Sequence, residues 1–341
     1  MAEPVGSYGV TASAASPAER VASGRRLVGS FDQIAGTRLV RVEDGPADGT
    51  RILEAWNADG LRIDIAVDRA FDIYQATVRG IGVAWLAPQG MQNRLSFESS
   101  GEGWLRNFHG GLFVTCGLDN VGDAIRRPVP EYKSPITELQ FNRHGRMSNA
   151  AARIVRTELV LEGDDAGIRL EAEIRQGSLH LESLVMRRRI FIPLFGTRIE
   201  IADTVTNAGA VAAPVALLYH INLGHPFVNP GGALTIPMPE GQPDHVHTLQ
   251  VPEPTVQQTV RVFEPQPSDS GWVHLNYSES GRQRATVSYL SKWMPTLLLW
   301  ELSRERSFVL GPAPTTRSDD IDVVLEPDES LSTGLTFDFV G

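Results

Sequence analysis

The sequence predicts an all-β fold built from large antiparallel sheets. Three stretches alternate apolar and polar residues: Leu61–Val67, Ile168–Arg175 and Leu331–Phe339. Such alternation is typical of a strand that buries only one face. No helical pattern of about 10–15 residues recurs between the strands, which argues against a parallel βαβ architecture. The number of strands in this chain of 341 residues therefore indicates large antiparallel sheets packed face to face.

The N-terminal segment differs from the rest of the chain. Residues 1 to about 14 are small and polar, and we expect them to be disordered. Ser16-Pro-Ala-Glu19 combines an N-cap, a proline at the first helical position and a capping-box glutamate. This pattern predicts a short helix to about Ser23. We therefore expect residues 1–25 to form a flexible segment with a short helix, and residues 26–341 to form a single domain.

Turn signals such as Asp59-Gly60 and Asn207-Ala-Gly209 separate the remaining predicted strands. Three proline-rich stretches, 126–135, 237–254 and 264–268, are interpreted as loops, because strands of the same character resume on both sides. Further strands are predicted at 51–56, 73–79, 154–162, 179–192, 198–206, 214–223, 284–290, 296–302, 307–310 and 321–326.

Composition excludes several classes of partner. The formal net charge is −10 and no basic patch stands out, which argues against nucleic acid. No apolar run approaches the ~20 residues needed to span a bilayer. The single cysteine, Cys116, excludes an internal disulfide, is typical of a reducing compartment and lies in an apolar run. The N-terminus lacks a secretion signal, so we expect a cytoplasmic protein.

Polar residues with glycine neighbours are concentrated between Trp104 and Asn149. His144 stands in Arg-His-Gly-Arg, where Gly145 permits close approach of a ligand and the arginines offer forked donors. The alternative to a site role for His144 is a solvent-exposed basic turn. For His109, the histidine before Gly110, the alternative is a loop residue without a binding role. The residues of this stretch that we expect to bind substrate are His109, Asp119, Asn120 and Arg146.

A second histidine, His220, interrupts an apolar strand. By parity it shares one face of that strand with Asn222. A buried polar group without a partner costs ~1–3 kcal/mol, so both side chains need a partner or a ligand. A core histidine bonded to a carbonyl is the alternative. Our interpretation is that His144 and His220 face each other over a sugar, with Asn222 in the same site.

Three other features are open to two readings. Arg69, in Asp68-Arg-Ala-Phe-Asp72, either forms a structural ion pair at a turn or reaches a site carboxylate or a sugar hydroxyl. Trp300, like Trp85 and Trp104, either packs in the core or forms a platform under a sugar ring. His245-Val-His247 has metal-ligand spacing, but without an evident third ligand we interpret these residues as surface histidines of a proline-rich loop.

Several motifs together resemble one family. They are Asp68-Arg-x-Phe-Asp-Ile73, Trp85-Leu-x-Pro88, Gly103-Trp-Leu-Arg106, Gly110-Gly-Leu-x-x-Thr-Cys-Gly-Leu118 and His144-Gly-Arg-x-Ser-Asn149. After about residue 26 the chain is similar to the DUF4432 branch of the aldose 1-epimerase (galactose mutarotase-like) superfamily. The resemblance implies a β-supersandwich and acid–base chemistry on a hemiacetal. In mutarotases a carboxylate takes the proton of the anomeric hydroxyl, a histidine protonates the ring oxygen, and the ring opens and closes again.

The resemblance also implies roles for single residues. His144 matches the first histidine of the family and His220 matches the second, the acid. The family pattern Gly-x-Glu-Pro becomes Gly311-Pro-Ala313-Pro314 here, so an alanine stands where the base is expected. Either Asp319, Asp320 or Glu301 substitutes, or the protein binds sugars or acts on them by other chemistry, or the glutamate has been removed to trap a ligand. Arg317 adds a donor for an acidic or ketonic substrate.

The predicted function is therefore an aldose 1-epimerase-like isomerase that uses His144 and His220 without a cofactor or metal. One alternative is a catalytically silent carbohydrate-binding protein. Another is a metal-dependent sugar lyase or isomerase using His245 and His247. The expected partner is a small sugar or sugar derivative, and a homodimer is one way to protect the edge strands.

Overall fold

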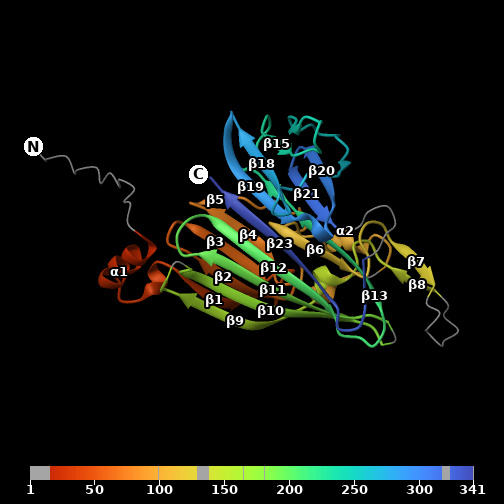
Figure 1. The fold of residues 1–341 in the computed structure, drawn as a ribbon, viewed down its shortest axis with the longest axis horizontal. Helices are drawn as coiled ribbons and strands as arrows, with labels where there is room; N and C mark the ends of the chain where they lie inside the picture. Colours follow the sequence, from red (N-terminus) through yellow and green to blue (C-terminus); the bar gives the residue numbers. More distant parts are fainter. Residues whose placement is uncertain are drawn as a thin grey trace, which may run out of the picture.

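A computed structural model describes residues 16–98, 100–128, 138–163, 165–179, 181–316 and 323–340. Within these residues the strands form three large antiparallel sheets and one small hairpin (Figure 1). The prediction of an all-β fold is confirmed. Arg317, Asp319 and Asp320 lie outside the described residues, as do residues 1–15 of the expected disordered segment.

The longest sheet has nine strands in the described part of the chain. Its strands alternate as the sequence predicts; in β11, for example, Leu184, Met186 and Ile190 are buried and Arg187 and Arg189 are exposed. In spatial order the strands are β16 (His245–Thr248), β15 (Ala233–Ile236), β18 (Trp272–Glu279), β19 (Arg282–Leu290), β23 (Ser330–Phe339), β12 (Arg198–Asn207), β11 (Ser183–Pro193), β10 (Gly167–Gly177) and β9 (Ala152–Val160).

A five-stranded sheet lies behind β9 to β12 in the view of Figure 1. Its buried residues Leu53 and Ile63 belong to the same core cluster as Leu170 and Ile190 of the nine-stranded sheet, so the two sheets share one core. Its strands are β1 (Gly36–Arg41), β2 (Arg51–Trp56), β3 (Leu61–Ala66), β4 (Asp72–Val78) and β5 (Ile81–Gly82).

The third sheet buries side chains on both of its faces. Leu217, Tyr219 and Leu299 face the main core, whereas Leu218 and Ala313 belong to a separate cluster on the opposite face. The strands are β17 (Thr259–Phe263), β20 (Thr296–Arg304), β21 (Ser307–Thr315), β13 (Ala213–Ile221) and β22 (Val323–Leu325), with β6 (Phe113–Leu118) paired to β13 and β14 (Leu223–Gly224) paired to β21. The hairpin is β7 (Ile125–Pro128) with β8 (Glu138–Phe141).

Helices are few among the described residues, and all are short. α1 (Pro17–Leu27) starts where the sequence predicts, with Ser16 and Glu19 forming the capping box, and it ends four residues beyond the expected Ser23. None of the described helices is long and apolar enough to cross a membrane. The others are α2 (Gly103–Asn107) and the 3₁₀ turns η1 (Phe31–Gln33), η2 (Arg94–Ser96), η3 (Met147–Asn149) and η4 (Ser291–Trp293).

Some strands depart from the sequence prediction. β6 is buried at every position, so it lacks the alternation that marks the other strands. The proline-rich stretch 126–135, predicted to be a loop, begins with strand residues of the hairpin β7–β8, and 237–254 contains β16. Each of these short strands pairs with a partner that the local pattern does not reveal.

A buried ion cluster joins the three sheets through Arg188 of β11. The Arg188 side chain is fully buried and bonds Asp72 of β4 at 2.5 Å and Asp203 of β12 at 2.6 Å. Asp203 also accepts a hydrogen bond from the Tyr219 hydroxyl of β13, and Asp72 accepts one from the Thr115 backbone of β6. This network fixes β6 and β13, which carry the candidate site, against the other sheets.

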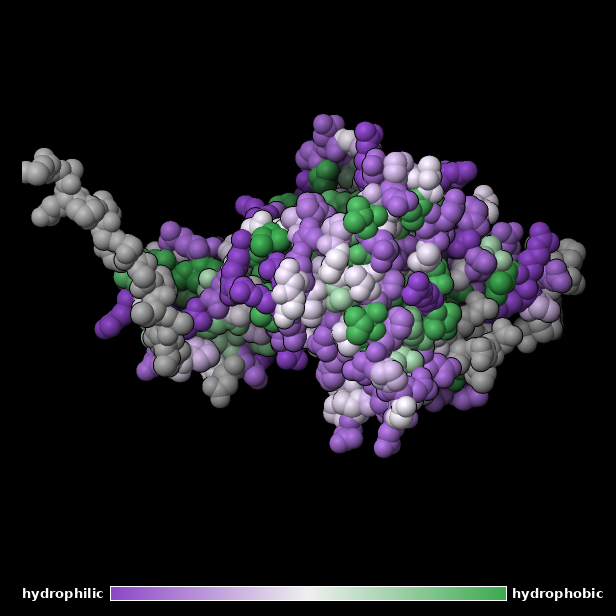
Figure 2. All heavy atoms as spheres, turned by 90° about the horizontal axis from the view of Figure 1, so that it is seen from above, coloured by the Kyte–Doolittle hydropathy of each residue, from purple (hydrophilic) through white to green (hydrophobic). Residues whose placement is uncertain are grey.

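The surface in the view of Figure 2 has hydrophobic groups set between hydrophilic ones. Exposed aliphatic side chains occur on the edge strand β17, where Val260 and Val262 are 55% and 66% exposed. Across the strand pair they lie opposite Trp300 and Leu298 of β20, on the face of the third sheet that is turned away from the main core.

Candidate functional site

His144 and His220 lie close together on that outer face of the third sheet. Their ring centroids are 6.1 Å apart and their planes are nearly perpendicular, at 85°. His220 is near the end of β13, and His144 is in the loop between β8 and η3. The structure thus brings together the two histidines that the sequence singled out.

The loop of His144 is tied to β6 by its backbone. Gly117 donates to the His144 carbonyl at 2.9 Å, and Arg146 donates to the Gly117 carbonyl at 3.0 Å. Gly145 has a φ of +66°, and a Cβ there would lie 2.4 Å from the Gly117 carbonyl oxygen. Glycine is therefore required for the loop to pass this close to β6 and hold His144 beside His220.

Aromatic side chains surround the two imidazoles. The ring centroids of Trp104 and His144 are 4.4 Å apart. The centroid of the His220 ring lies 4.8 Å from that of Phe108 and 5.1 Å from that of Trp300. Trp85 packs edge-on against Trp300 at 5.7 Å. We call this set of rings the aromatic frame: Trp85, Trp104, Phe108 and Trp300. Two alternative roles follow from the sequence for the three tryptophans, a platform under a sugar ring or packing in the core. Phe108 was not identified from the sequence.

The frame is both anchored and accessible. The Trp104 indole donates to the Ser148 hydroxyl at 3.2 Å, and the Trp300 indole donates to Gln258 at 3.0 Å. Trp104 is buried, whereas both histidines and Trp300 are partly exposed. Apolar ring faces beside polar nitrogen atoms are suited to a ligand with both C–H faces and hydroxyl groups.

The environment keeps both imidazoles neutral at pH 7. Burial lowers the pKa of His220 to about 4, although its hydrogen bond to Asn222 opposes this effect. Burial, with His220 and Arg143 nearby, lowers the pKa of His144 to about 3. Among the described residues neither ring has a carboxylate partner. The pair therefore resists protonation through the ordinary titration range of histidine.

These pKa values predict an acid-sensitive fold. As pH falls from about 6.5 to about 4, His220 in the unfolded chain binds a proton that the folded chain does not. The free energy of unfolding should then fall by about 1.4 kcal/mol per pH unit for this one proton. In His220→Gln the free energy of unfolding should depend less steeply on pH, by that amount per pH unit. Urea unfolding at several pH values between 6.5 and 4 would measure the difference. The exposed His225→Gln is the control, and an equal slope in wild type and His220→Gln would contradict the prediction.

Ala313 lies beside His220. Leu218 pairs with Thr315 and Leu223 pairs with Leu310 in the same register, which places Ala313 across from His220 on neighbouring strands. Its side chain is 2% exposed and packs in the cluster that includes Trp104 and Leu218. The position where the resemblance places a glutamate therefore faces the candidate site, but it supplies only a methyl group.

Glu301 does not replace that carboxylate. It follows Trp300 on β20, so its side chain points to the opposite face of the strand. There it bonds His247 at 2.6 Å and the Ser303 hydroxyl at 2.5 Å. Of the three substitutes that the sequence offered, this one lies away from the histidines, and Asp319 and Asp320 fall outside the described residues.

Two predicted substrate residues, Arg69 and His109, are buried. Arg69 is 1% exposed and donates to the backbone carbonyls of Ser148, Gln92 and Asn107 at 2.8 to 2.9 Å. All three sides of its guanidinium are occupied, so it ties loops together and is not free for a ligand. His109 is fully buried against Tyr74, with ring centroids 5.5 Å apart. Burial and Arg69 hold the pKa of His109 well below its usual range.

Asp119, Asn120 and Arg146 also have structural partners. Arg146 bridges Asp119, at 2.8 Å, and Glu182. The Asn120 amide donates to the carbonyls of Asp123 and Asn142 at 2.8 Å. Asp119 and Glu182 line a hollow of about 440 Å³ that reaches Ala213, at the start of β13. His220 is near the other end of that strand, roughly 20 Å from Ala213 along β13.

His245 and His247 belong to no metal-ligand cluster in the part of the chain that the structure describes. Within the described ranges, no group of three or more His, Cys, Asp and Glu residues could hold a metal ion. His247 is 5% exposed and pairs with Glu301, so it is not the surface histidine that the sequence predicted. β16 carries it inward, because the segment pairs with β15 rather than forming a loop.

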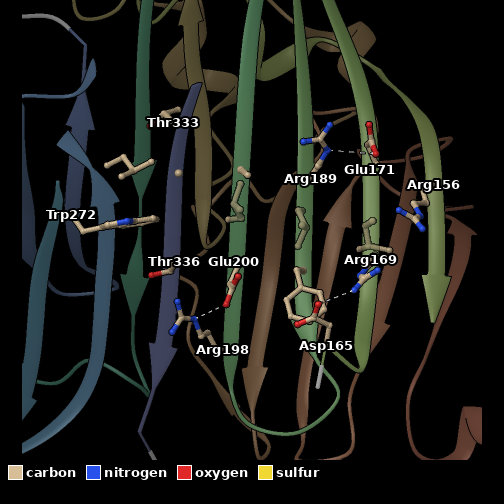
Figure 3. A pocket seen from close by; sticks show the side chains of 17 residues that line it. Arg156, Asp165, Arg169, Glu171, Arg189, Arg198, Glu200, Trp272, Thr333 and Thr336 are labelled. Carbon is tan, nitrogen blue, oxygen red and sulfur yellow. Dashed lines mark ion pairs between the residues drawn. The ribbon is translucent and has the colours of Figure 1, made fainter. Parts of the chain in front are cut away.

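A hollow of about 540 Å³ on the nine-stranded sheet is a rival location (Figure 3). Most of its charged side chains pair with one another, for example Arg198 with Glu200 at 2.9 Å and Arg169 with Asp165 at 3.6 Å. Trp272 lies at its edge, and no histidine lines it. This hollow therefore lacks the unpaired acid–base groups that the histidine pair provides.

Comparison with known proteins agrees with this architecture. The family model described as domain of unknown function DUF4432 matches residues 47–331. No curated protein matched the chain. Three solved structures with the same fold are at most 18% identical in sequence.

The first of these structures is a candidate aldose 1-epimerase from Klebsiella pneumoniae, 18% identical, with a TM-score of 0.79 over 91% of this chain and 86% of that one. A galactose mutarotase-like protein from Clostridium acetobutylicum is 10% identical, with a TM-score of 0.61 over 90% and 100% of the two chains. Galactose 1-epimerase from Lactobacillus acidophilus is 12% identical, with a TM-score of 0.56 over 90% and 99%. The chain belongs to the DUF4432 family, and its fold is that of the galactose mutarotase-like proteins.

Proposed function

We propose that the protein interconverts the anomers of a sugar or sugar acid at the site of His144 and His220. The observation that carries this proposal is the pair of accessible imidazoles, 6.1 Å apart, inside the aromatic frame. Two ring nitrogens at this spacing can contact neighbouring oxygens of one hemiacetal. The aromatic frame offers faces for the C–H surface of the sugar ring. The fold, shared with proteins described as aldose 1-epimerases, supports the same chemistry.

The test is anomer exchange, followed by NMR saturation transfer across a panel of aldoses and uronates. Exchange by the wild-type chain well above the uncatalysed rate would support the proposal. An Ala313→Glu variant, which restores a carboxylate beside His220, should be measured in parallel. Activity only in that variant would mean that the natural chain lacks its base, and the proposal of catalysis would then fail.

A carbohydrate-binding protein without turnover is the second candidate function. The methyl group of Ala313 at the expected position of the base favours it. Calorimetry separates the two functions, because a silent binder would release heat with a sugar that it does not convert. The expected partner in either case is a small sugar.

Loss of one ring of the frame should weaken binding. We expect Trp300→Ala to raise the dissociation constant or KM for the sugar about tenfold, which is about 1.4 kcal/mol, a plausible size for a lost aromatic contact. Calorimetric titration or initial rates would measure it. Trp272→Ala is a matched control, because Trp272 lies in the separate hollow on the nine-stranded sheet. Equal losses in both variants would contradict a platform role for Trp300.

A further inference from the structure

The hydrogen bonds of the two histidines fix where their protons sit. The orientation of the Asn222 side-chain amide is determined first. Its Nδ2 donates to the Gly111 carbonyl at 3.0 Å and to the His220 carbonyl at 2.9 Å. Carbonyl oxygens only accept, so the amide cannot be flipped without placing its oxygen against two other oxygens. Asn222 Oδ1 therefore points at the His220 ring.

His220 must place its proton on the nitrogen that faces this oxygen. Its Nδ1 lies 2.7 Å from Asn222 Oδ1, and two acceptors at that distance would repel each other. Nδ1 therefore carries the hydrogen. In a neutral ring the other nitrogen, Nε2, then has a free lone pair. No partner of Nε2 occurs among the described residues, so His220 presents a proton acceptor to a ligand.

His144 has the opposite arrangement. The backbone N–H of Gly122, which can only donate, points at Nδ1 of His144 at 3.3 Å. Nδ1 is therefore the acceptor of the neutral ring, and the hydrogen is on Nε2. Within the described part of the chain this Nε2–H also has no protein acceptor. His144 thus presents a hydrogen-bond donor to the ligand that His220 meets as an acceptor.

We propose that His220 is the proton acceptor of this site and His144 its fixed hydrogen-bond donor, so that a hemiacetal opens without a carboxylate. The proposal rests on the function proposed above and assigns its residues. The resemblance implied that His220 is the acid and that a glutamate is the base. Here Asn222 gives the role of the base to His220, and the methyl group at Ala313 is consistent with that change.

The proton that leaves the sugar in this step returns to it. His220 Nε2 takes the proton of the anomeric hydroxyl, and the ring becomes an imidazolium whose Nδ1–H remains bonded to Asn222. The bond between the anomeric carbon and the ring oxygen breaks, with its electron pair staying on that oxygen. The imidazolium returns the proton to this oxygen, while the Nε2–H of His144 stabilises the developing negative charge and stays in place. Ring closure on the other face is the reverse of the same steps.

The experiment reads the tautomers directly. Long-range ¹H–¹⁵N correlation of the full chain with ¹⁵N-labelled histidine at pH 7 distinguishes protonated from unprotonated ring nitrogens. His220→Gln and His144→Gln identify the signals. We expect hydrogen on Nδ1 of His220 and on Nε2 of His144. Hydrogen on Nε2 of His220, or on Nδ1 of His144, in the wild-type spectrum would overturn the inference.

Asn222→Leu tests the positioning role of Asn222. Without the amide oxygen, His220 should populate the Nε2–H form, and kcat for anomer exchange should fall by about 10²-fold or more with KM little changed, as expected for a histidine in the wrong tautomer. Asn229→Leu is the matched control, because Asn229 bonds Nδ1 of the exposed His225 in the same way at 2.9 Å. It should alter only the His225 signals. An unchanged His220 tautomer and kcat in Asn222→Leu would overturn the role of Asn222.

The inference and the proposed function fail in different ways. Anomer exchange by a wild-type chain with the opposite tautomers would leave the function intact and overturn the assignment of roles. The expected tautomers without exchange on any sugar would overturn the function, and with it the proton transfer assigned to His220.

Discussion

Replacing His220 with glutamine is expected to lower the rate of anomer exchange by about 10²–10⁴-fold, the usual contribution of a general acid–base group. The glutamine side chain can fill much of the same space and form hydrogen bonds, but it cannot hold and return a proton at neutral pH. Sugar binding should persist, because the aromatic frame is unchanged. Saturation-transfer NMR gives the rate, and calorimetry gives the affinity.

The control for this substitution is His225→Gln. His225 is exposed and bonds Asn229 rather than any residue of the frame, so exchange should keep its wild-type rate. Wild-type exchange in His220→Gln as well would remove His220 from the mechanism. Loss of both exchange and folding would be recognised by circular dichroism, and His144→Gln would then carry the test with a smaller expected loss.

The second large effect concerns stability. Arg188→Met should lower the free energy of unfolding by about 3–5 kcal/mol, because it leaves buried carboxylates without their cation. Both the Arg188 side chain and its partners Asp72 and Asp203 have no exposed surface. Urea unfolding at pH 7 would measure the loss. Burial already raises the pKa of Asp72 and Arg188 opposes that rise, so without Arg188 this carboxyl group should bind a proton more readily and the variant should lose less of its remaining stability as pH falls.

Arg189→Met supplies the matched control. This neighbouring residue is on the other face of β11, its side chain is 61% exposed, and its partner Glu171 lies 3.7 Å away. An exposed pair of this kind contributes about 0–1 kcal/mol. Similar losses for the two substitutions would mean that the buried cluster does not hold the sheets together as argued above.

Local pattern predicted much of the fold. β3, β10 and β23 alternate because one face of each packs on a core, and that alternation is visible in the residues themselves. β6 has no exposed face, so its position depends on β13 and on the loop of His144, which no local pattern reveals. The capping box of α1 needs only four residues, and it was correctly predicted.

The site was predicted only in part, for a similar reason. Parity placed His220 and Asn222 on one face of a strand, and the structure shows them bonded to each other. The sequence does not show which polar residues find partners in the protein. Arg69 satisfies three backbone carbonyls from distant segments, and Arg146 bridges two carboxylates. Such long-range contacts make these residues structural, although their chemical type suits a sugar site equally well.

The central claim is that two neutral histidines act on a sugar where a carboxylate is replaced by Ala313. The most direct measurement is saturation-transfer NMR on wild type, His220→Gln and Ala313→Glu with a panel of aldoses and uronates. The account predicts exchange in the wild type for at least one sugar, its loss in His220→Gln, and no requirement for the added carboxylate. Absence of exchange in the wild type with every sugar, or exchange that survives His220→Gln, would contradict it.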